Sequence, residues 1–198
     1  MVQPRIALLA LAALACAHAQ ETVQPLTGPM QLPYYSRNIL DACIADSTCS
    51  SLVDASGAGL SRTDELLASA FRTSIGMIAH DWKPEPAPTV CLAVGPFERS
   101  QDPPPVVLET VKRSRIAVRP RGACEPVASG GGWVMVLRDS HEAALLLTAP
   151  NIGPPAGDTV QLSTSYEAAM LWSVTWLCEY VWGGNHWRAT KCVVTGIS

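Results

Sequence analysis

The segment WSVTWLCEYVW at residues 172–182 alternates large apolar residues with smaller or polar ones, which is typical of a half-buried β-strand. One face of this strand would carry Trp172, Val174, Trp176, Cys178, Tyr180 and Trp182. The turn-forming residues Gly183-Gly-Asn-His186 follow, and the chain continues as a second extended segment from Trp187 to Ile197. We therefore expect a C-terminal β-hairpin whose aromatic face is part of the core.

A disulfide across this hairpin would fix how its two strands pair. If Cys178 faces Cys192, the turn centres on Asn185 and contains three or five residues. The same register predicts that Trp182 lies opposite Arg188. Glycine and asparagine tolerate the positive φ angles of such a turn, so the sequence is consistent with this bridge.

The sequence upstream predicts one long helix and several shorter elements. Leu67, Phe71, Ile75 and Ile78 recur at helical spacing in a helix expected from residue 64 to 80, with Ser61 or Thr63 as its N-cap. Short helices are expected at 36–44 and 106–112, the latter capped by Asp102-Pro103. Strands are expected at 89–94, 115–121, 133–138, 143–149 and 159–182. The third and fourth are expected to form a hairpin, and the last is expected to be one long bent strand. Residues 47–59 are expected to form a loop.

These elements predict the α+β class: one long helix plus short helices packed on a curved antiparallel sheet, stapled by disulfides. The domain is expected to span residues 34–198. Residues 1–19 have the pattern of a secretory signal peptide, with Arg5, an apolar run and the cleavage site Ala17-His18-Ala19. Residues 20–33 contain three prolines and are expected to form an extended lead-in.

Export and cysteine content support each other. Of the seven cysteines, Cys16 lies in the signal, which leaves an even number for an oxidising compartment. We expect the pairs Cys43–Cys49, Cys91–Cys124 and Cys178–Cys192. Leu14-Ala15-Cys16 also loosely resembles a bacterial lipobox, so lipid anchoring through Cys16 is the alternative to a periplasmic or secreted protein.

Composition excludes several classes of protein. The formal net charge is −3, with acidic and basic residues mixed, so nucleic-acid binding is not expected. After the signal, no apolar run reaches the roughly 20 residues of a membrane span. His80, His141 and His186 lack metal-ligand spacing, and no cofactor motif is present, so no cofactor is expected.

No motif for nucleophilic catalysis occurs in the sequence. A glycosidase needs only two carboxylates at any sequence separation, and four lie among the expected strands: Glu142, Asp158, Glu167 and Glu179. Solvent exposure is the simpler explanation for each of them. No catalytic residue is therefore assigned, and a carboxylate-dependent hydrolase is kept as an alternative.

Two surfaces are candidate binding sites. Trp182 and Trp187 lie nearest the turn of the last hairpin and are expected to be exposed, with Arg188 beside them. Arg115, Arg119 and Arg121 would form a row on the solvent face of an edge strand. Such arginines also discourage edge-to-edge pairing, so the row can exist without a ligand.

The order of several short motifs resembles a loose group of uncharacterised exported bacterial proteins. These motifs are Asp64-Glu-Leu-Leu67, Val90-Cys-Leu-Ala-Val94, Asp102-Pro103, Val118-Arg-Pro120, Cys124 and the Gly184-x-x-Trp187 turn. The strand-rich later part is also similar to cystatin-like and nuclear-transport-factor-like folds. The resemblance implies one helix packed across a curved antiparallel sheet, and it implies no catalytic residue.

The sequence favours an exported, non-catalytic binding or inhibitor-type module of the bacterial cell envelope, in contact with an unidentified protein or envelope polymer. The alternatives are a small carboxylate-dependent envelope hydrolase and a structural envelope protein with no small ligand. A close pair of buried carboxylates would favour the hydrolase.

Overall fold

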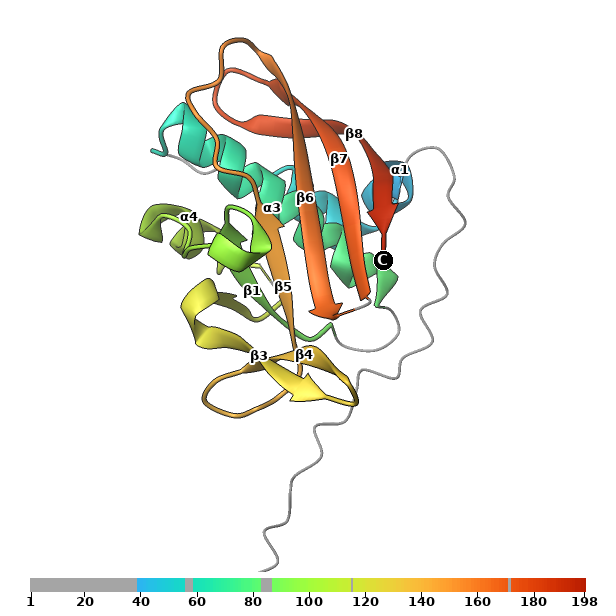
Figure 1. Ribbon diagram of the computed structural model, residues 1–198. Helices are drawn as coiled ribbons and strands as arrows, with labels where there is room; N and C mark the ends of the chain where they lie inside the picture. Colours follow the sequence, from blue (N-terminus) through green and yellow to red (C-terminus); the bar gives the residue numbers. More distant parts are fainter. Residues whose placement is uncertain (1–38, 56–58, 83–86, 115, 171) are drawn as a thin grey trace, which may run out of the picture.

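The computed structural model describes residues 39–55, 59–82, 87–114, 116–170 and 172–198 (Figure 1). The helices are α1 (Ile39–Ile44), α2 (Ser47–Val53), α3 (Arg62–Asp81) and α4 (Pro105–Val111), with 3-10 turns η1 (Phe97–Arg99) and η2 (Arg121–Ala123). The strands are β1 (Thr89–Val94), β2 (Val118–Pro120), β3 (Cys124–Ser129), β4 (Gly132–Leu137), β5 (Ala144–Ala149), β6 (Thr159–Ala169), β7 (Trp172–Trp182) and β8 (Trp187–Ile197). The expected α+β class is confirmed.

The strands form one curled sheet centred on β6. Its order is β2-β1-β5-β6-β4-β3, and β7 and β8 extend from β6 as a separate branch. All pairs that involve β3, β4, β6, β7 or β8 are antiparallel, whereas β1 pairs in parallel with both β2 and β5. The sheet is therefore antiparallel over its C-terminal half and parallel at the β2 edge, a mixture that the sequence did not indicate.

Helix α3 covers one face of β6, β7 and β8 and forms the main core with them (Figure 1). It begins at a serine N-cap, because the Ser61 hydroxyl accepts a hydrogen bond from the Asp64 amide at 3.1 Å. The predicted apolar stripe of α3 is buried in this core, and so are Trp176 and Tyr180 of β7. The prediction that the aromatic face of β7 is core material is therefore confirmed.

A buried ion pair lies within α3, and a chain of hydrogen bonds connects it to the last hairpin. Arg72 donates a hydrogen bond from Nη2 to Glu65 Oε1 at 2.8 Å, and a second one to the Ser69 hydroxyl at 3.0 Å. The Ser69 hydroxyl in turn donates to the carbonyl oxygen of Trp187. Since Arg72 and Glu65 are both buried, removing Glu65 would leave the Arg72 charge without this ion pair in a low-dielectric interior.

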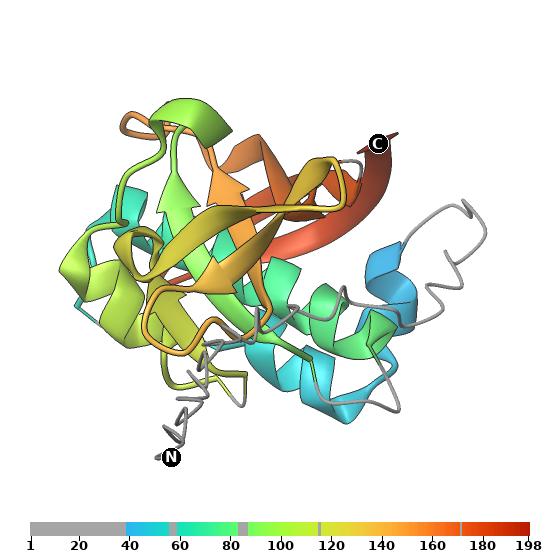
Figure 2. The same ribbon diagram turned by 60° about the horizontal axis from the view of Figure 1, so that its bottom comes forward.

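A second, smaller core lies on the opposite face of the sheet. The hairpin of β3 and β4 crosses over β1 and β5 (Figure 2) and buries Cys91, Cys124, Met135 and Leu146 with them. Trp133 at the start of β4 stacks on Phe97, with ring centroids 5.1 Å apart. Positive φ angles at Gly130 and Gly131 form the tight turn of this hairpin.

The predicted loop at 47–59 is wrong in its first part, where α2 forms. Cys49 and Val53 of α2 are buried against the core, and this burial outweighs the weak helix propensity of its serines. The contact with α3 is close, because a Cβ atom added at Gly76 would lie 2.7 Å from Cys49 Sγ. Glycine is therefore required where the two helices meet.

Two predicted strand arrangements are also wrong. Residues 159–182 form the hairpin of β6 and β7 rather than one strand, with a β-bulge between Glu167 and Ala169 and no glycine or proline to mark the turn. β4 and β5 are not a hairpin, because only an isolated bridge between Val136 and Ala143 joins them. β4 instead pairs with β3, a strand that the sequence analysis missed.

Asp102 was expected to cap α4, but the residue at that position is Pro104. The Asp102 carboxylate accepts a hydrogen bond from the Gly122 amide at 2.7 Å. It therefore stabilises the turn η2 on a neighbouring loop instead of a helix end.

Candidate functional site

The three cysteine pairs lie in the pairing expected from the sequence. The Cα–Cα separations are 5.3 Å for Cys43–Cys49, 6.3 Å for Cys91–Cys124 and 4.1 Å for Cys178–Cys192. The first pair links α1 to α2, the second joins β1 to β3 in the smaller core, and the third bridges β7 and β8. All three are buried and hold elements of the scaffold together.

The register of the last hairpin agrees with the prediction only as far as the disulfide. Cys178 pairs with Cys192, but a β-bulge after Glu179 shifts the register by one residue. Trp182 therefore pairs with Trp187, not Arg188, and the turn comprises the four residues 183–186. The predicted odd-length turn is wrong because β8 contains one unpaired residue, Thr190, at this bulge.

Trp187 is fully buried, so its predicted exposure is wrong, while Trp182 is half-buried. The guanidinium carbon of Arg62 lies 5.0 Å from the Trp182 ring centroid and 5.1 Å from that of Trp187. The Trp187 indole N–H donates to the carbonyl oxygen of Arg62 at 2.9 Å, and the Arg62 guanidinium forms a salt bridge with Asp158. We call Arg62, Trp182, Trp187 and Asp158 the Arg62 clasp; its cation comes from the chain itself.

The predicted arginine surface is not assembled as a row. Arg119 is exposed on β2, whereas Arg121 is half-buried and donates to the Cys124 carbonyl oxygen at 2.7 Å. Arg115 lies outside the described residues. Arg188 is exposed and forms a salt bridge with Asp54 at 3.0 Å. Arg121 thus has a structural role at the turn before β3, and the interpretation of it as a free surface charge is wrong.

The four carboxylates singled out in the sequence lie in different surroundings. Glu142 is exposed in the turn before β5, and Asp158 is the counter-ion of Arg62. Glu179 accepts a hydrogen bond from the Thr190 hydroxyl at 2.8 Å. Burial raises the pKa of Glu167 on β6.

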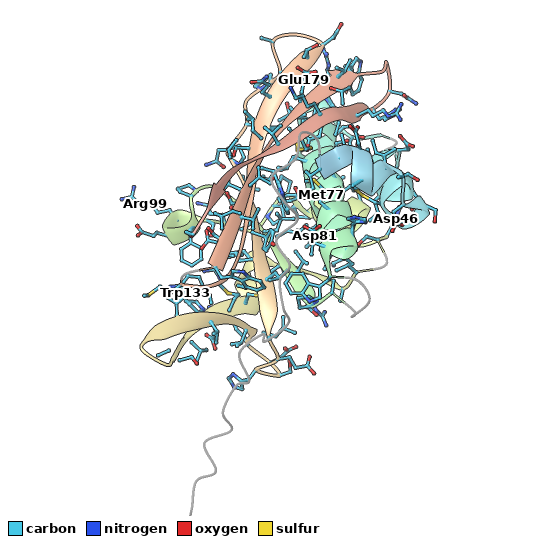
Figure 3. All side chains as sticks on the ribbon, turned by 90° about the vertical axis from the view of Figure 1, so that its right-hand side faces the viewer. Asp46, Met77, Asp81, Arg99, Trp133 and Glu179 are labelled. Carbon is cyan, nitrogen blue, oxygen red and sulfur yellow. A yellow bond between two sulfur atoms is a disulfide. The ribbon has the colours of Figure 1, made fainter. Side chains whose placement is uncertain are left out.

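A carboxyl group that the sequence analysis did not select lies at the end of α3. Asp81 is the last residue of this helix and is half-buried. Burial raises the pKa of Asp81 to about 6, and the adjacent His80 lowers it in part. Burial, together with the charge of Asp81, also raises the pKa of the Tyr166 hydroxyl, so Tyr166 stays neutral next to it. Figure 3 shows Asp81 on the same side of the molecule as Asp46, with Glu179 on the sheet away from both.

Several aromatic rings lie near the end of α3, where Asp81 is located. Trp82 follows Asp81 directly and contacts Trp172 at the start of β7, with ring centroids 5.6 Å apart and planes at 59°. The Tyr166 ring meets Trp172 edge-on at 6.5 Å and Trp176 at 5.1 Å. Trp82 and Trp172 are half-buried, so each presents part of its ring to solvent. We call Asp81, Trp82 and Trp172, with Tyr166 behind them, the Asp81 site.

The Asp81 carboxylate has no partner comparable to that of Asp158. Within the described part of the chain, no hydrogen bond or salt bridge reaches it; His80 contributes only an electrostatic interaction. The His80 Nδ1 atom lies 3.7 Å from Asp46 Oδ2, on the turn between α1 and α2. A partly buried anion at the C-terminal end of a helix also faces the negative end of the helix dipole. A cationic or hydrogen-bond-donating ligand would give the Asp81 carboxylate a partner and would offset its repulsion by the negative end of the helix dipole.

Glu167 does not form the close carboxylate pair of a glycosidase with Asp81. Tyr166 and Glu167 are adjacent on β6, so their side chains point to opposite faces of the sheet. Asp81 acts on Tyr166 and therefore lies on the α3 side of the sheet, while Glu167 points away from it. Among the described residues, no group of three His, Cys, Asp or Glu side chains is arranged to hold a metal ion.

The sequence offered only a faint signal for this site. Asp81-Trp82 stands at the end of the predicted helix, but nothing in the sequence brings Trp172 next to it. That contact depends on α3 lying across β6 and β7, which no local pattern specifies. An aspartate followed by a tryptophan at the end of a helix does not by itself indicate a functional site.

Comparison with protein-family models finds no match for this chain, and comparisons with curated proteins and with solved structures find none either. The resemblance to exported bacterial proteins therefore stays a prediction. No helix within the described residues combines the length and apolar character needed to cross a membrane.

Proposed function

We propose that the protein is an exported, non-catalytic binding or inhibitor-type module of the bacterial cell envelope, and that it contacts its partner through the Asp81 site. The observation that carries this proposal is the half-exposed pair Trp82 and Trp172 beside a carboxylate with no hydrogen-bond partner in the described chain. Aromatic anchors next to a few oriented polar groups are typical of binding sites.

The scaffold supports this role. Three buried cysteine pairs fit a protein made for an oxidising compartment. Residues 1–19 supply the expected export signal, with periplasmic or secreted localisation as the favoured outcome and lipid anchoring through Cys16 as the alternative. The two tryptophans lie at a helix end and at a strand end, and both rings pack in part against the main core.

Site-specific photo-crosslinking in the producing cells tests the proposal. Met170 and Val106 are matched positions because both are exposed apolar residues, at 50% and 46%, and Met170 lies two residues before Trp172. A photoreactive residue at position 170 should capture a partner that position 106 does not. The capture should be lost when Asp81→Asn and Trp172→Ala are added. Equal capture at both positions, or capture that persists in that double variant, would contradict this role for the Asp81 site.

A carboxylate-dependent hydrolase is the second candidate, because a carboxyl group with a pKa of about 6 can serve as a general acid near neutral pH. Asp81 would be the acid, and Asp46, on the other side of His80, would be the nearest candidate for a second carboxylate. Release of fragments from purified cell-wall glycan by the wild-type protein, lost in Asp81→Asn, would favour this candidate over the binding module.

A further inference from the structure

The two ends of α3 carry tryptophan pairs of nearly the same geometry. At the first residue of the helix, Trp182 and Trp187 have ring centroids 5.4 Å apart and planes at 57°. At its last residue, Trp82 and Trp172 have centroids 5.6 Å apart and planes at 59°. A carboxylate is associated with each pair: Asp158 forms a salt bridge with Arg62 at the first, and Asp81 directly precedes Trp82 in the second.

The pairs differ in one component. The Arg62 guanidinium lies over both rings of the first pair and forms a salt bridge with Asp158. Over Trp82 and Trp172, the described residues place no cationic group, and they give Asp81 no salt bridge. Among the described residues, the Asp81 site therefore has the rings and the anion of the Arg62 clasp but no matching cation.

We propose that the Asp81 site binds the guanidinium group of an arginine side chain contributed by a partner protein. The proposal rests on the proposed binding function and names the chemistry that the site recognises. In the complex, the guanidinium would lie against the exposed faces of Trp82 and Trp172 and donate hydrogen bonds to the Asp81 carboxylate. The chain already uses this combination of contacts for Arg62.

Helix electrostatics favour a cation more at this end than at the other. Arg62 lies at the N-terminal end of α3, where the helix dipole is positive and disfavours a cation, yet it is held there. Asp81 lies at the C-terminal end, where the dipole attracts a cation. An external guanidinium would therefore gain an interaction that Arg62 does not have.

Arginine fits the site better than lysine does. A guanidinium is planar, stacks on indole rings and can donate two parallel hydrogen bonds to one carboxylate. An ammonium is a compact, strongly hydrated charge that cannot stack in this way. The partner is accordingly expected to present arginine, and a lysine substituted for it should bind more weakly.

Three short synthetic peptides test the proposal: acetyl-Gly-Arg-Gly-amide, the same peptide with citrulline, and the same peptide with lysine. Citrulline keeps the shape of arginine and removes its charge. The indole N–H resonances of Trp82 and Trp172 report binding in two-dimensional NMR, assigned with Trp→Phe variants. The arginine peptide should shift both resonances and bind about five-fold more tightly than the citrulline peptide, as expected for one cation–π contact and one ion pair.

Two variants test whether the arginine peptide binds at the Asp81 site and not elsewhere on the molecule. Asp81→Asn should weaken binding of the arginine peptide about five-fold, and it should not unfold the protein, since it removes a partly buried charge. Asp158→Asn changes the matched carboxylate at the other end of α3 and should leave the affinity unchanged. Equal binding of arginine and citrulline peptides, or an Asp81→Asn variant that binds as the wild type does, would overturn the proposal. Shifts of the two indoles with a chitin-derived oligosaccharide but not with the arginine peptide would also overturn it, in favour of a polymer ligand.

The failure of this inference and the failure of the proposed function give different results. If position 170 captures a partner but the arginine peptide does not bind, the binding role stands and the guanidinium assignment is wrong. If the arginine peptide binds but no partner is captured, the chemistry of the site stands and its role in the envelope is wrong.

Discussion

The Arg62 clasp and the Asp81 site lie at opposite ends of the same helix and are built from the same kinds of side chain, yet within the described residues only the clasp contains a cation. In the clasp, the indole N–H of Trp187 and the carboxylate of Asp158 both have partners. At the other end, Trp82 and Trp172 remain partly open to solvent, and burial raises the pKa of Asp81 to about 6. The first arrangement stabilises the fold, whereas the second destabilises it whenever Asp81 is ionised.

This difference separates structural from functional use of one chemical motif. A site that serves folding is expected to have its charges and hydrogen-bond groups satisfied within the chain. A site that serves binding keeps some of them unsatisfied until the partner arrives, and the free protein is less stable as a result. Measurements of stability can therefore distinguish the two ends of α3 without any knowledge of the partner.

The largest expected difference between the ends lies in their tryptophans. Trp187→Ala removes a fully buried ring and leaves its cavity, so it should lower the free energy of unfolding by about 3–5 kcal/mol. Trp172→Ala removes a half-buried ring and should cost about half as much. Urea denaturation followed by far-ultraviolet circular dichroism measures both changes. If Trp172→Ala cost as much as Trp187→Ala, the Asp81 site would be part of the core and not a binding surface.

Neutralising Asp81 should give the next largest effect, with the opposite sign. The folded-state pKa of about 6 lies above the ordinary value of 3.8, so the folded protein binds the proton more tightly than the unfolded chain does. The contribution of this group to stability therefore falls as the pH rises from about 4 to 6, and it stays low above that range. Asp81→Asn should raise the free energy of unfolding by about 1–3 kcal/mol at pH 7.

The pH dependence is the stronger part of this prediction. The gain from Asp81→Asn should disappear below about pH 4, where the wild-type carboxyl group is protonated in both states. The matched variant Asp158→Asn should instead destabilise the protein slightly at pH 7, because its carboxylate is the counter-ion of Arg62. Thermal unfolding at pH 4 and pH 7 tests both; an Asp81→Asn variant that is less stable than the wild type at pH 7 would refute the view of Asp81 as an unsatisfied charge.

The sequence was sufficient to predict the elements of these sites but not their assembly. Alternation along residues 172–182 predicted β7 and its buried face, because a strand buried on one side must alternate. The burial of Trp187 escaped prediction because it depends on long-range packing, such as the contact with Arg62, 125 residues earlier in the chain. The Asp81 site escaped for the same reason, since only the packing of α3 on the sheet brings Trp172 to the helix end.

Removing the cation of the clasp should give a smaller loss than removing a ring. Arg62→Ala deletes the contacts with Trp182 and Trp187 and the salt bridge with Asp158, on a side chain that is 38% exposed. The free energy of unfolding should fall by about 1 kcal/mol. Arg62→Lys keeps the charge and should recover less than half of that loss if planar stacking matters. Full recovery by lysine would weaken the argument that these tryptophan pairs prefer a guanidinium.

The smallest effect is expected at Arg188, next to the clasp but on the solvent side of β8. Its salt bridge with Asp54 spans 3.0 Å, and both side chains are 53% exposed, so water and salt screen the attraction. Arg188→Ala should change the free energy of unfolding by less than about 0.5 kcal/mol, and added salt should remove even that difference. Denaturation of this variant in parallel with Arg62→Ala compares two arginines at the same end of the molecule. A loss at Arg188 as large as that at Arg62 would mean that proximity to the hairpin turn, and not the tryptophan pair, decides what an arginine contributes there.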